Sequence, residues 1–126
     1  MFRKSVSMMM FFCIVICCSG CVTMSTKEKY QYKDISSRLH EVGMEEEKTK
    51  SPGLAGGLNL LPGVGNAYLG QWDLFAINFL MWPVGIIWSV PQAAGDAKMI
   101  NKKDTVYYYT EGEGKKKLEE VEAGRK

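Results

Sequence analysis

The sequence predicts an all-α protein: a short helical hairpin in or on a membrane, with an N-terminal signal segment and flexible charged arms. The first observation is the uneven placement of charge, because residues 51–95 contain one charged side chain, Asp73, between segments rich in Lys, Glu and Asp. The second is a series of glycines and prolines that divides this apolar block into two halves. A globular domain needs polar groups over its whole surface, so this layout indicates a membrane-embedded block between aqueous arms.

Residues 1–20 resemble the signal peptide of a bacterial lipoprotein. Two basic residues form a positive start, and residues 6–18 are an almost unbroken apolar run. A serine and a glycine stand directly before Cys21. This resembles a lipobox, in which the signal is cut before the cysteine and the thiol is acylated. The alternative is an uncleaved anchor, since residues 6–22 could nearly span a bilayer. Both interpretations place the remaining chain outside the cytoplasm, and the lipobox predicts lipidation at Cys21.

Cleavage before Cys21 decides the chemistry that remains. The other three cysteines leave with the signal, so the mature chain has no thiol for a disulfide, a metal or nucleophilic catalysis. Loss of the two basic residues of the signal leaves 14 of the 16 Lys and Arg, which equals the 14 Asp and Glu. The mature chain is then neutral, and its charge gives no indication of nucleic-acid binding. His40, the single histidine, stands on a charged arm. We therefore expect no enzyme activity, no metal and no cofactor.

The charged arms carry weaker signals. Residues 21–52 contain four apolar residues on one helical face: Tyr32, Ile35, Leu39 and Val42. So short a helix is marginal alone in water. We interpret this arm as a partly ordered tether, with a docking helix for a partner as the alternative. Residues 102–126 form a charged tail that we expect to be disordered, although residues 105–110 have strand propensity.

The apolar block predicts a hydrophobic helical hairpin plus an amphipathic helix over residues 53–101. Residues 54–69 and 74–90 form its two halves, with the bend at residues 70–73. Small residues let membrane helices approach closely, so we expect the glycine-rich first half to pack against the bulky second half. Asp73 suits a loop or the cap of the following helix.

The second half is interrupted and is followed by a further helix. A proline and a glycine within it predict a kink near Trp82. Pro91 is a favoured first-turn residue, and apolar residues after it share one helical face: Ala93, Ala97 and Ile100. A short amphipathic helix at the membrane surface is the expectation for this stretch.

The glycines do not form a nucleotide loop. Gly63 and Gly65 match the start of the dinucleotide fingerprint, but its third glycine would fall at Tyr68. A Walker loop needs a lysine, and none occurs between Lys50 and Lys98. Both phosphate-binding motifs are therefore excluded.

A motif G-x-G-x-x-Y-x-G is formed by Gly63, Gly65, Tyr68 and Gly70, and residues 88–101 read WSVPQAAGDAKMIN. In these features residues 54–101 resemble the two-transmembrane-helix domain family and a bacterial lipoprotein branch of it, with the tyrosine one residue earlier than in the family. The resemblance implies a two-helix membrane architecture and no catalytic residues. Six residues are predicted to serve helix packing or the turn: Gly57, Gly63, Gly65, Tyr68, Gly70 and Asp73.

The membrane topology involves a conflict. A hairpin that crosses the membrane and returns to the side of Cys21 would leave the flanking lysines outside, against the positive-inside rule. We therefore favour shallow docking into the anchored leaflet over full spanning. Val22 follows the cysteine where an aspartate would retain a lipoprotein at the inner membrane, which slightly favours the outer membrane of a bacterial envelope.

The predicted function is that of a non-enzymatic, lipid-anchored envelope protein that is structural or recruits a partner. Membrane lipid is the expected partner. The alternative is a small accessory subunit of a membrane transport or secretion assembly, bound to another membrane protein through the glycine-rich face.

Overall fold

The computed structural model describes residues 21–82 and 85–125, and the predicted signal peptide, residues 1–20, lies outside these residues. Over the described part of the chain the structure consists of six helices without a strand, so the predicted all-α class is confirmed. The helices are α2 (Thr26–Val42), α3 (Pro52–Leu58), α4 (Val64–Tyr68), α5 (Trp72–Leu80), α6 (Ile86–Thr110) and α7 (Gly114–Ala123).

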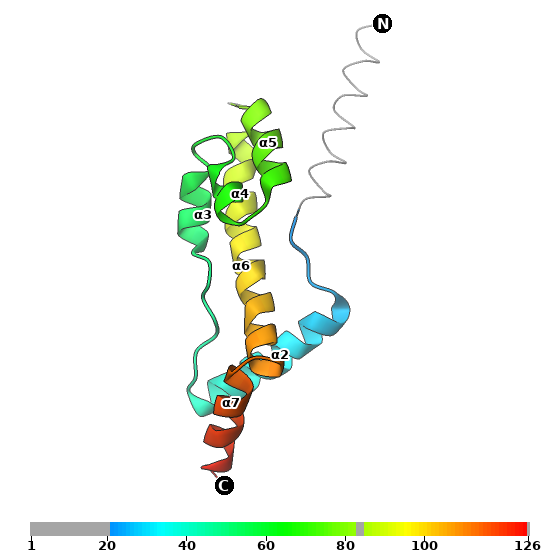
Figure 1. The fold of residues 1–126 in the computed structure, drawn as a ribbon, viewed down its shortest axis with the longest axis vertical. Coiled ribbons are helices and arrows are strands. Elements are labelled where there is room, and N and C mark those ends of the chain that lie inside the picture. The colour runs from blue at the N-terminus through cyan, green and yellow to red at the C-terminus, as the bar shows by residue number, and fades with distance from the viewer. Residues whose placement is uncertain (1–20, 83–84, 126) are drawn as a thin grey trace, which may run out of the picture.

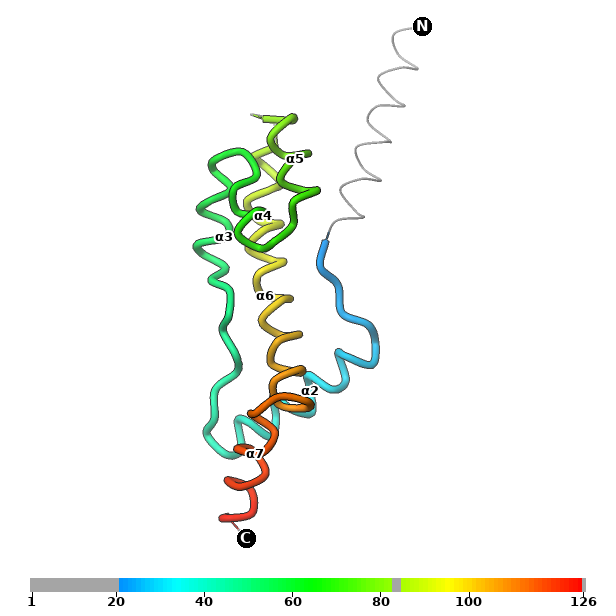
Figure 2. Tube along the Cα trace, in the orientation of Figure 1, coloured from blue at the N-terminus to red at the C-terminus, as the bar shows by residue number. Residues whose placement is uncertain are grey.

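Helix α6 is the axis of the molecule. Figure 1 shows α3, α4 and α5 beside its first half, and α2 and α7 beside its second half. The tube view in Figure 2 shows the extended chain after α2 running alongside α6 until it reaches α3. We call α3, α4, α5 and the first turns of α6 the apolar end, and α2, α7 and the second half of α6 the polar end.

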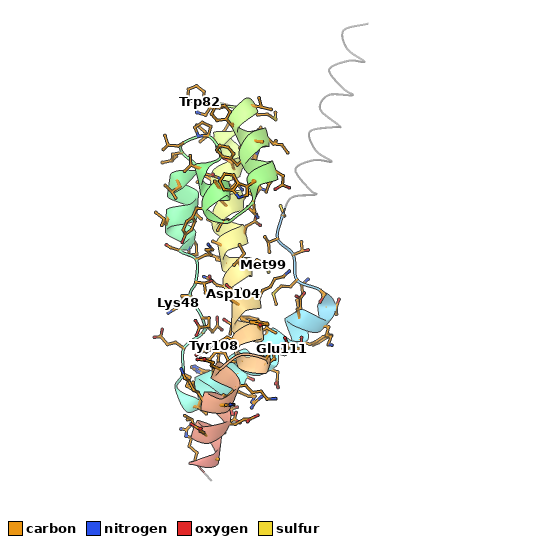
Figure 3. The ribbon with its side chains drawn as sticks, in the orientation of Figure 1. Lys48, Trp82, Met99, Asp104, Tyr108 and Glu111 are labelled. Carbon is orange, nitrogen blue, oxygen red and sulfur yellow. The ribbon has the colours of Figure 1, made fainter. Side chains whose placement is uncertain are left out.

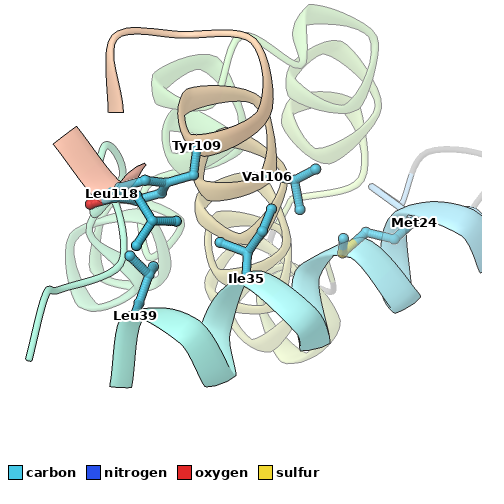
Figure 4. Close-up of a cluster of buried hydrophobic side chains, with 6 residues drawn as sticks. All are labelled: Met24, Ile35, Leu39, Val106, Tyr109 and Leu118. Atoms are coloured by element: carbon cyan, nitrogen blue, oxygen red, sulfur yellow. The ribbon is translucent and has the colours of Figure 1, made fainter. Parts of the chain in front are cut away.

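The core of the polar end is made of large apolar side chains. Six buried residues form this core, with Met24, just before α2, at one edge of it in Figure 4: Met24, Ile35, Leu39, Val106, Tyr109 and Leu118. Ile35 and Leu39 belong to the face predicted for α2, and they are 3% and 1% exposed. That face packs against α6 and α7 of the same chain, so α2 is not the partly ordered tether that the sequence favoured.

Local signals set both ends of α2. The Ser25 hydroxyl accepts a hydrogen bond from the Glu28 backbone N–H at 3.2 Å, and the Ser25 N–H donates to the Glu28 carboxylate at 2.6 Å. This capping box satisfies two donors at the helix start. The hydrogen bond from the Ser25 N–H to the carboxylate is the main cause that lowers the pKa of Glu28. Gly43, at φ +75°, ends the helix in the left-handed region that suits glycine.

The tail predicted to be disordered, residues 102–126, is largely helical within the described residues. Leu118 of α7 is 1% exposed and belongs to the polar-end core. The Arg38 guanidinium donates two hydrogen bonds to the Glu122 carboxylate, at 2.9 and 2.8 Å, which raise the pKa of Arg38. Residues 105–110 are helical despite their strand propensity because Val106 and Tyr109 are buried in the same core.

The extended chain after α2 is fastened to a stripe on α6. Asn101 exchanges two hydrogen bonds with the Lys50 backbone, at 2.8 and 2.7 Å. One turn further on, the Thr105 hydroxyl accepts from the backbone N–H of Glu47 at 3.0 Å. After another turn, the Tyr109 hydroxyl donates to the carbonyl of Glu45 at 3.0 Å. These side chains, spaced by four residues on α6, provide hydrogen-bond partners for backbone groups of a segment that is not helical.

The block predicted to form a hairpin, residues 53–101, is divided into more helices than expected. Its first half divides into α3 and α4, with Pro62 in the connection. Its second half divides where the kink near Trp82 was predicted, since α5 ends at Leu80 and α6 begins at Ile86. The amphipathic helix expected to begin at Pro91 is part of α6, which contains this proline in its second turn. Helix α3 packs mainly against α6.

The bend between the two halves lies where it was predicted. Gly70, at φ +81°, follows α4, and its N–H donates to the carbonyl of Ala67 at 3.0 Å. The N–H of Gln71 donates to the carbonyl of Asn66 at 2.9 Å. This pair of bonds is a Schellman motif, which requires a left-handed residue. Asp73 lies exposed in the first turn of α5, after the cap residue.

We expect Leu39→Ala to lower the free energy of unfolding by about 2–5 kcal/mol, because it opens a cavity in a core that holds three helices together. Denaturant unfolding followed by circular dichroism measures the change. Val121→Ala on α7, where the side chain is 40% exposed, is the control and should stay within about 0.5 kcal/mol. Equal stabilities of the two variants would contradict this account of the core.

Candidate functional site at the apolar end

The surface of the apolar end is covered by large hydrophobic side chains. Eight of them are at least half exposed: Leu54, Leu60, Leu61, Trp72, Phe79, Leu80, Trp82 and Ile87. Leu80 and Ile87 are 82% and 81% exposed, and Figure 3 shows Trp82 at the tip of the apolar end. So many exposed hydrophobic side chains at one end of a protein mark an interaction surface. None of the helices in the described residues is both long and apolar enough to cross a membrane.

The interior of the apolar end is polar. Asn59 and Asn66 are fully buried, and Asn78 and Ser89 are 3% and 1% exposed. The buried apolar residues beside them are mostly small: Ala55, Leu69, Ala93 and Ala97. This end therefore has amides inside and large hydrophobic side chains outside, the reverse of the usual arrangement in water.

Asn66 is the centre of this buried network. Its Oδ1 accepts hydrogen bonds from Nδ2 of Asn59 at 2.7 Å and Nδ2 of Asn78 at 2.9 Å. Its Nδ2 donates to Oε1 of Gln71 at 2.9 Å, and its backbone N–H donates to Oδ1 of Asn59 at 3.1 Å. Asn59 also donates to the carbonyl of Ser89 at 2.8 Å. One side chain thus links α4 to α5 and, through Asn59, to α6.

The network continues to the residue after Cys21. Gln71 Nε2 donates to Oδ2 of Asp96 at 2.8 Å, and the Val22 backbone N–H donates to the other oxygen at 3.0 Å. Gln92 Nε2 lies 3.8 Å from Sγ of Cys21. Asp96 is 4% exposed, and a buried carboxylate needs such donors. No buried side-chain nitrogen or oxygen in the described chain lacks a partner. The chain next to Cys21 is therefore held against α6.

Two of the predicted packing glycines lie at close helix contacts. A Cβ on Gly65 would lie 2.0 Å from the carbonyl oxygen of Ala55 and 2.7 Å from Oδ1 of Asn59. A Cβ on Gly63, which has φ +75°, would lie 2.6 Å from the carbonyl oxygen of Phe75. These distances leave no room for a side chain, so α4 requires glycine against both α3 and α5.

Gly57 and Tyr68, which were also predicted to serve helix packing or the turn, do not lie at these close helix contacts. A Cβ on Gly57 would have no atom within 4 Å, and the close contact of α3 with α6 occurs at Gly56, where a Cβ would lie 3.3 Å from the carbonyl oxygen of Val90. The packing predicted for Gly57 is therefore corrected to Gly56 within this chain. Tyr68 lies at the base of the apolar end, where its hydroxyl accepts a hydrogen bond from the Ser51 N–H at 3.2 Å.

Sequence reasoning missed the polar network. No prediction from the sequence connected Asn59 and Asn66 with Asn78, Gln71 or Asp96. The available signal was the repeated amide residue inside a block with one charge, because such residues must find partners when the block folds.

Comparisons of the chain with protein-family models, curated proteins and solved structures find no match.

We expect Gly65→Ala to destabilise the apolar end by roughly 1–3 kcal/mol or more, because the added methyl group would collide with backbone and with Asn59. Gly57→Ala is the matched control on α3, where open space and better helix propensity predict a gain of up to about 1 kcal/mol. Thermal unfolding of the detergent-solubilised protein distinguishes the two variants. Equal losses for both would refute the packing described for α4.

Proposed function

We propose that the protein is a non-enzymatic, lipid-anchored protein of the bacterial cell envelope, whose apolar end embeds in the leaflet that holds the acyl chains of Cys21. The observation that carries the proposal is the combination of a hydrophobic outer surface and a fully satisfied polar interior in one end of the molecule. In lipid, the outer surface needs no further cover, and the buried side-chain nitrogen and oxygen atoms of the described residues already have their partners.

The position of Cys21 along α6 supports shallow embedding. The chain at Cys21 and Val22 meets α6 near Gln92 and Asp96. Between Ile86 and Asp96 a helix rises about 15 Å, which is half of a hydrocarbon core of about 30 Å. An apolar end of this height, beginning at the level of the lipid anchor, fits within a single leaflet.

The polar end then faces the aqueous compartment and offers the surface for a structural role or a recruited partner. The residues after Cys21 support an outer-membrane location, because Val22 stands where an aspartate would retain a lipoprotein at the inner membrane. The motif of Gly63, Gly65, Tyr68 and Gly70 supports a relation to the two-transmembrane-helix domain family, as part of the same proposal.

One observation favours a second candidate, the accessory subunit of a membrane assembly. Gly53 and Gly57 of α3 are exposed, and a Cβ on either would meet nothing within 4 Å. Leu54, between them, is 50% exposed. Small residues on an exposed helix permit close approach of another membrane helix.

We expect metabolic labelling with radioactive palmitate to label the wild-type protein and not Cys21→Ala, because the thiol is the acyl acceptor. Ser19→Ala, next to the cleavage site, keeps the small residue and serves as the control that retains the label. An unlabelled wild-type protein refutes the lipid anchor.

A cysteine in place of Leu80 tests the embedding, since the mature chain has no cysteine other than the acylated one. We expect Leu80→Cys to resist a membrane-impermeant maleimide from either side of the membrane and to react in denaturant. Lys116→Cys on α7 is the exposed control and should react in at least tenfold greater yield at short times. Rapid labelling of Leu80→Cys in membranes contradicts the proposed embedding.

The same variant separates the two candidate functions. After purification and reconstitution into vesicles of lipid alone, the first proposal expects Leu80→Cys to remain protected. Protection in native membranes that disappears in reconstituted vesicles indicates that a partner protein covers the apolar end, as the accessory subunit requires.

A further inference from the structure

A hollow of about 530 Å³ lies where the apolar end meets the polar end. Its wall is formed by the end of the extended chain, the start of α3 and the middle of α6. The lining residues are Glu46, Lys48, Lys50, Ser51, Pro52, Lys98, Asn101 and Lys102. Four of these eight residues are lysines, so the hollow gathers more positive charge than the neutral mature chain would place there by chance.

The acidic residue of the wall is already engaged. The Glu46 carboxylate accepts hydrogen bonds from the Tyr32 hydroxyl at 2.9 Å and from the Ser36 hydroxyl at 2.7 Å, both on α2. Burial, followed by the hydrogen bond to this carboxylate, raises the pKa of Tyr32. Glu46 is thereby fixed on the α2 side of the hollow.

The lysines keep most of their charge unpaired. Among the described residues, Lys48 forms an ion pair with Glu45 at 3.0 Å, but both side chains are more than 70% exposed and such pairs are weak. Lys50 donates to the carbonyl of Tyr68 at 3.1 Å, and Lys102 lies 5.0 Å from the centre of the Tyr32 ring. These two contacts hold the ammonium groups in position without cancelling their charge.

The position of the hollow along α6 points to the ligand. From Ile86 to Lys98 a helix rises about 18 Å, slightly more than the half-thickness of a hydrocarbon core, about 15 Å. With the apolar end embedded as proposed, Lys98 and Lys102, one turn apart on α6, lie at the level of the lipid phosphates.

We propose that this hollow binds the phosphate-bearing headgroup of an anionic phospholipid from the leaflet that holds the apolar end. This inference rests on the proposed function, and it names the class of lipid that the embedded protein binds preferentially. The anionic phosphate forms ion pairs with the ammonium groups of Lys98 and Lys102. The acyl chains of the same lipid lie along the surface of the apolar end. Basic residues at a membrane surface attract anionic lipids in this way.

The test uses the mature, lipidated protein in mild detergent with equal amounts of phosphatidylglycerol and phosphatidylcholine. Native mass spectrometry measures the ratio of the two bound lipids. We expect wild type to prefer phosphatidylglycerol, and Lys98→Gln/Lys102→Gln to lose that preference by about tenfold. Lys115→Gln/Lys116→Gln removes the same charge from α7 and should stay within about twofold of wild type. Lys98→Arg/Lys102→Arg should retain the preference, which separates lost charge from lost folding.

The inference is overturned by no preference in wild type, by an unchanged preference in Lys98→Gln/Lys102→Gln, or by an equal loss in the α7 control. Soluble glycerol 1-phosphate in excess should displace less than half of the bound phosphatidylglycerol. Complete displacement assigns the hollow to soluble phosphate compounds and overturns the lipid assignment. If Leu80→Cys is protected while the preference is absent, this inference fails and the proposed function stands. Exposure of Leu80→Cys overturns both.

Discussion

The hydrogen bonds around the Asn66 side chain are the interaction on which the apolar end depends. Helices α3, α4 and α5 have 7, 5 and 9 residues, too few to be stable alone. Their apolar core is mostly alanine and cannot replace the missing stability with large buried surfaces. The amide groups join the short helices, and the glycines of α4 allow them to come close enough for these bonds to form. Such bonds are stronger where water is excluded.

The two ends of α6 are stabilised by different means. The polar end uses buried leucine, isoleucine and tyrosine side chains, a capping box and the Arg38–Glu122 pair. The apolar end uses amides, glycines and backbone carbonyls inside a hydrophobic surface. Under the proposed function this difference follows from the surroundings. Hydrophobic burial is a driving force in water, whereas in lipid close packing and internal hydrogen bonds take its place.

The sequence predicted the features that depend on local chemistry. The helical class, the bend at residues 70–73, the interruption near Trp82 and the shared helical face of Ile35 and Leu39 follow from residue types and their spacing. The left-handed conformation of Gly70 and the burial of the α2 face were not predicted. Membrane embedding and lipidation at Cys21 stay predictions that belong to the proposed function.

The features that sequence reasoning did not find depend on contacts between distant residues. Residues 105–110 prefer strand locally and become helical because Tyr109 is buried against α2 and α7. Helix α7 has little apolar content, and Leu118 is buried partly against residues of α2, which lie far back in the chain. The partners of Asn66 span residues 59–78, and the network reaches Asp96. Periodicity over one segment contains no information on such pairings.

The continuity of α6 has a consequence for any partner in the aqueous compartment. The helix passes without a break from the apolar end to the polar end, and the extended chain fastened to Asn101, Thr105 and Tyr109 runs beside it. From Asp96 to Thr110 it rises about 21 Å. Under the proposed function, α6 is a rigid spacer that holds α2 and α7 at one fixed distance from the lipid headgroups on the aqueous side, so a partner must approach the membrane to that distance to bind.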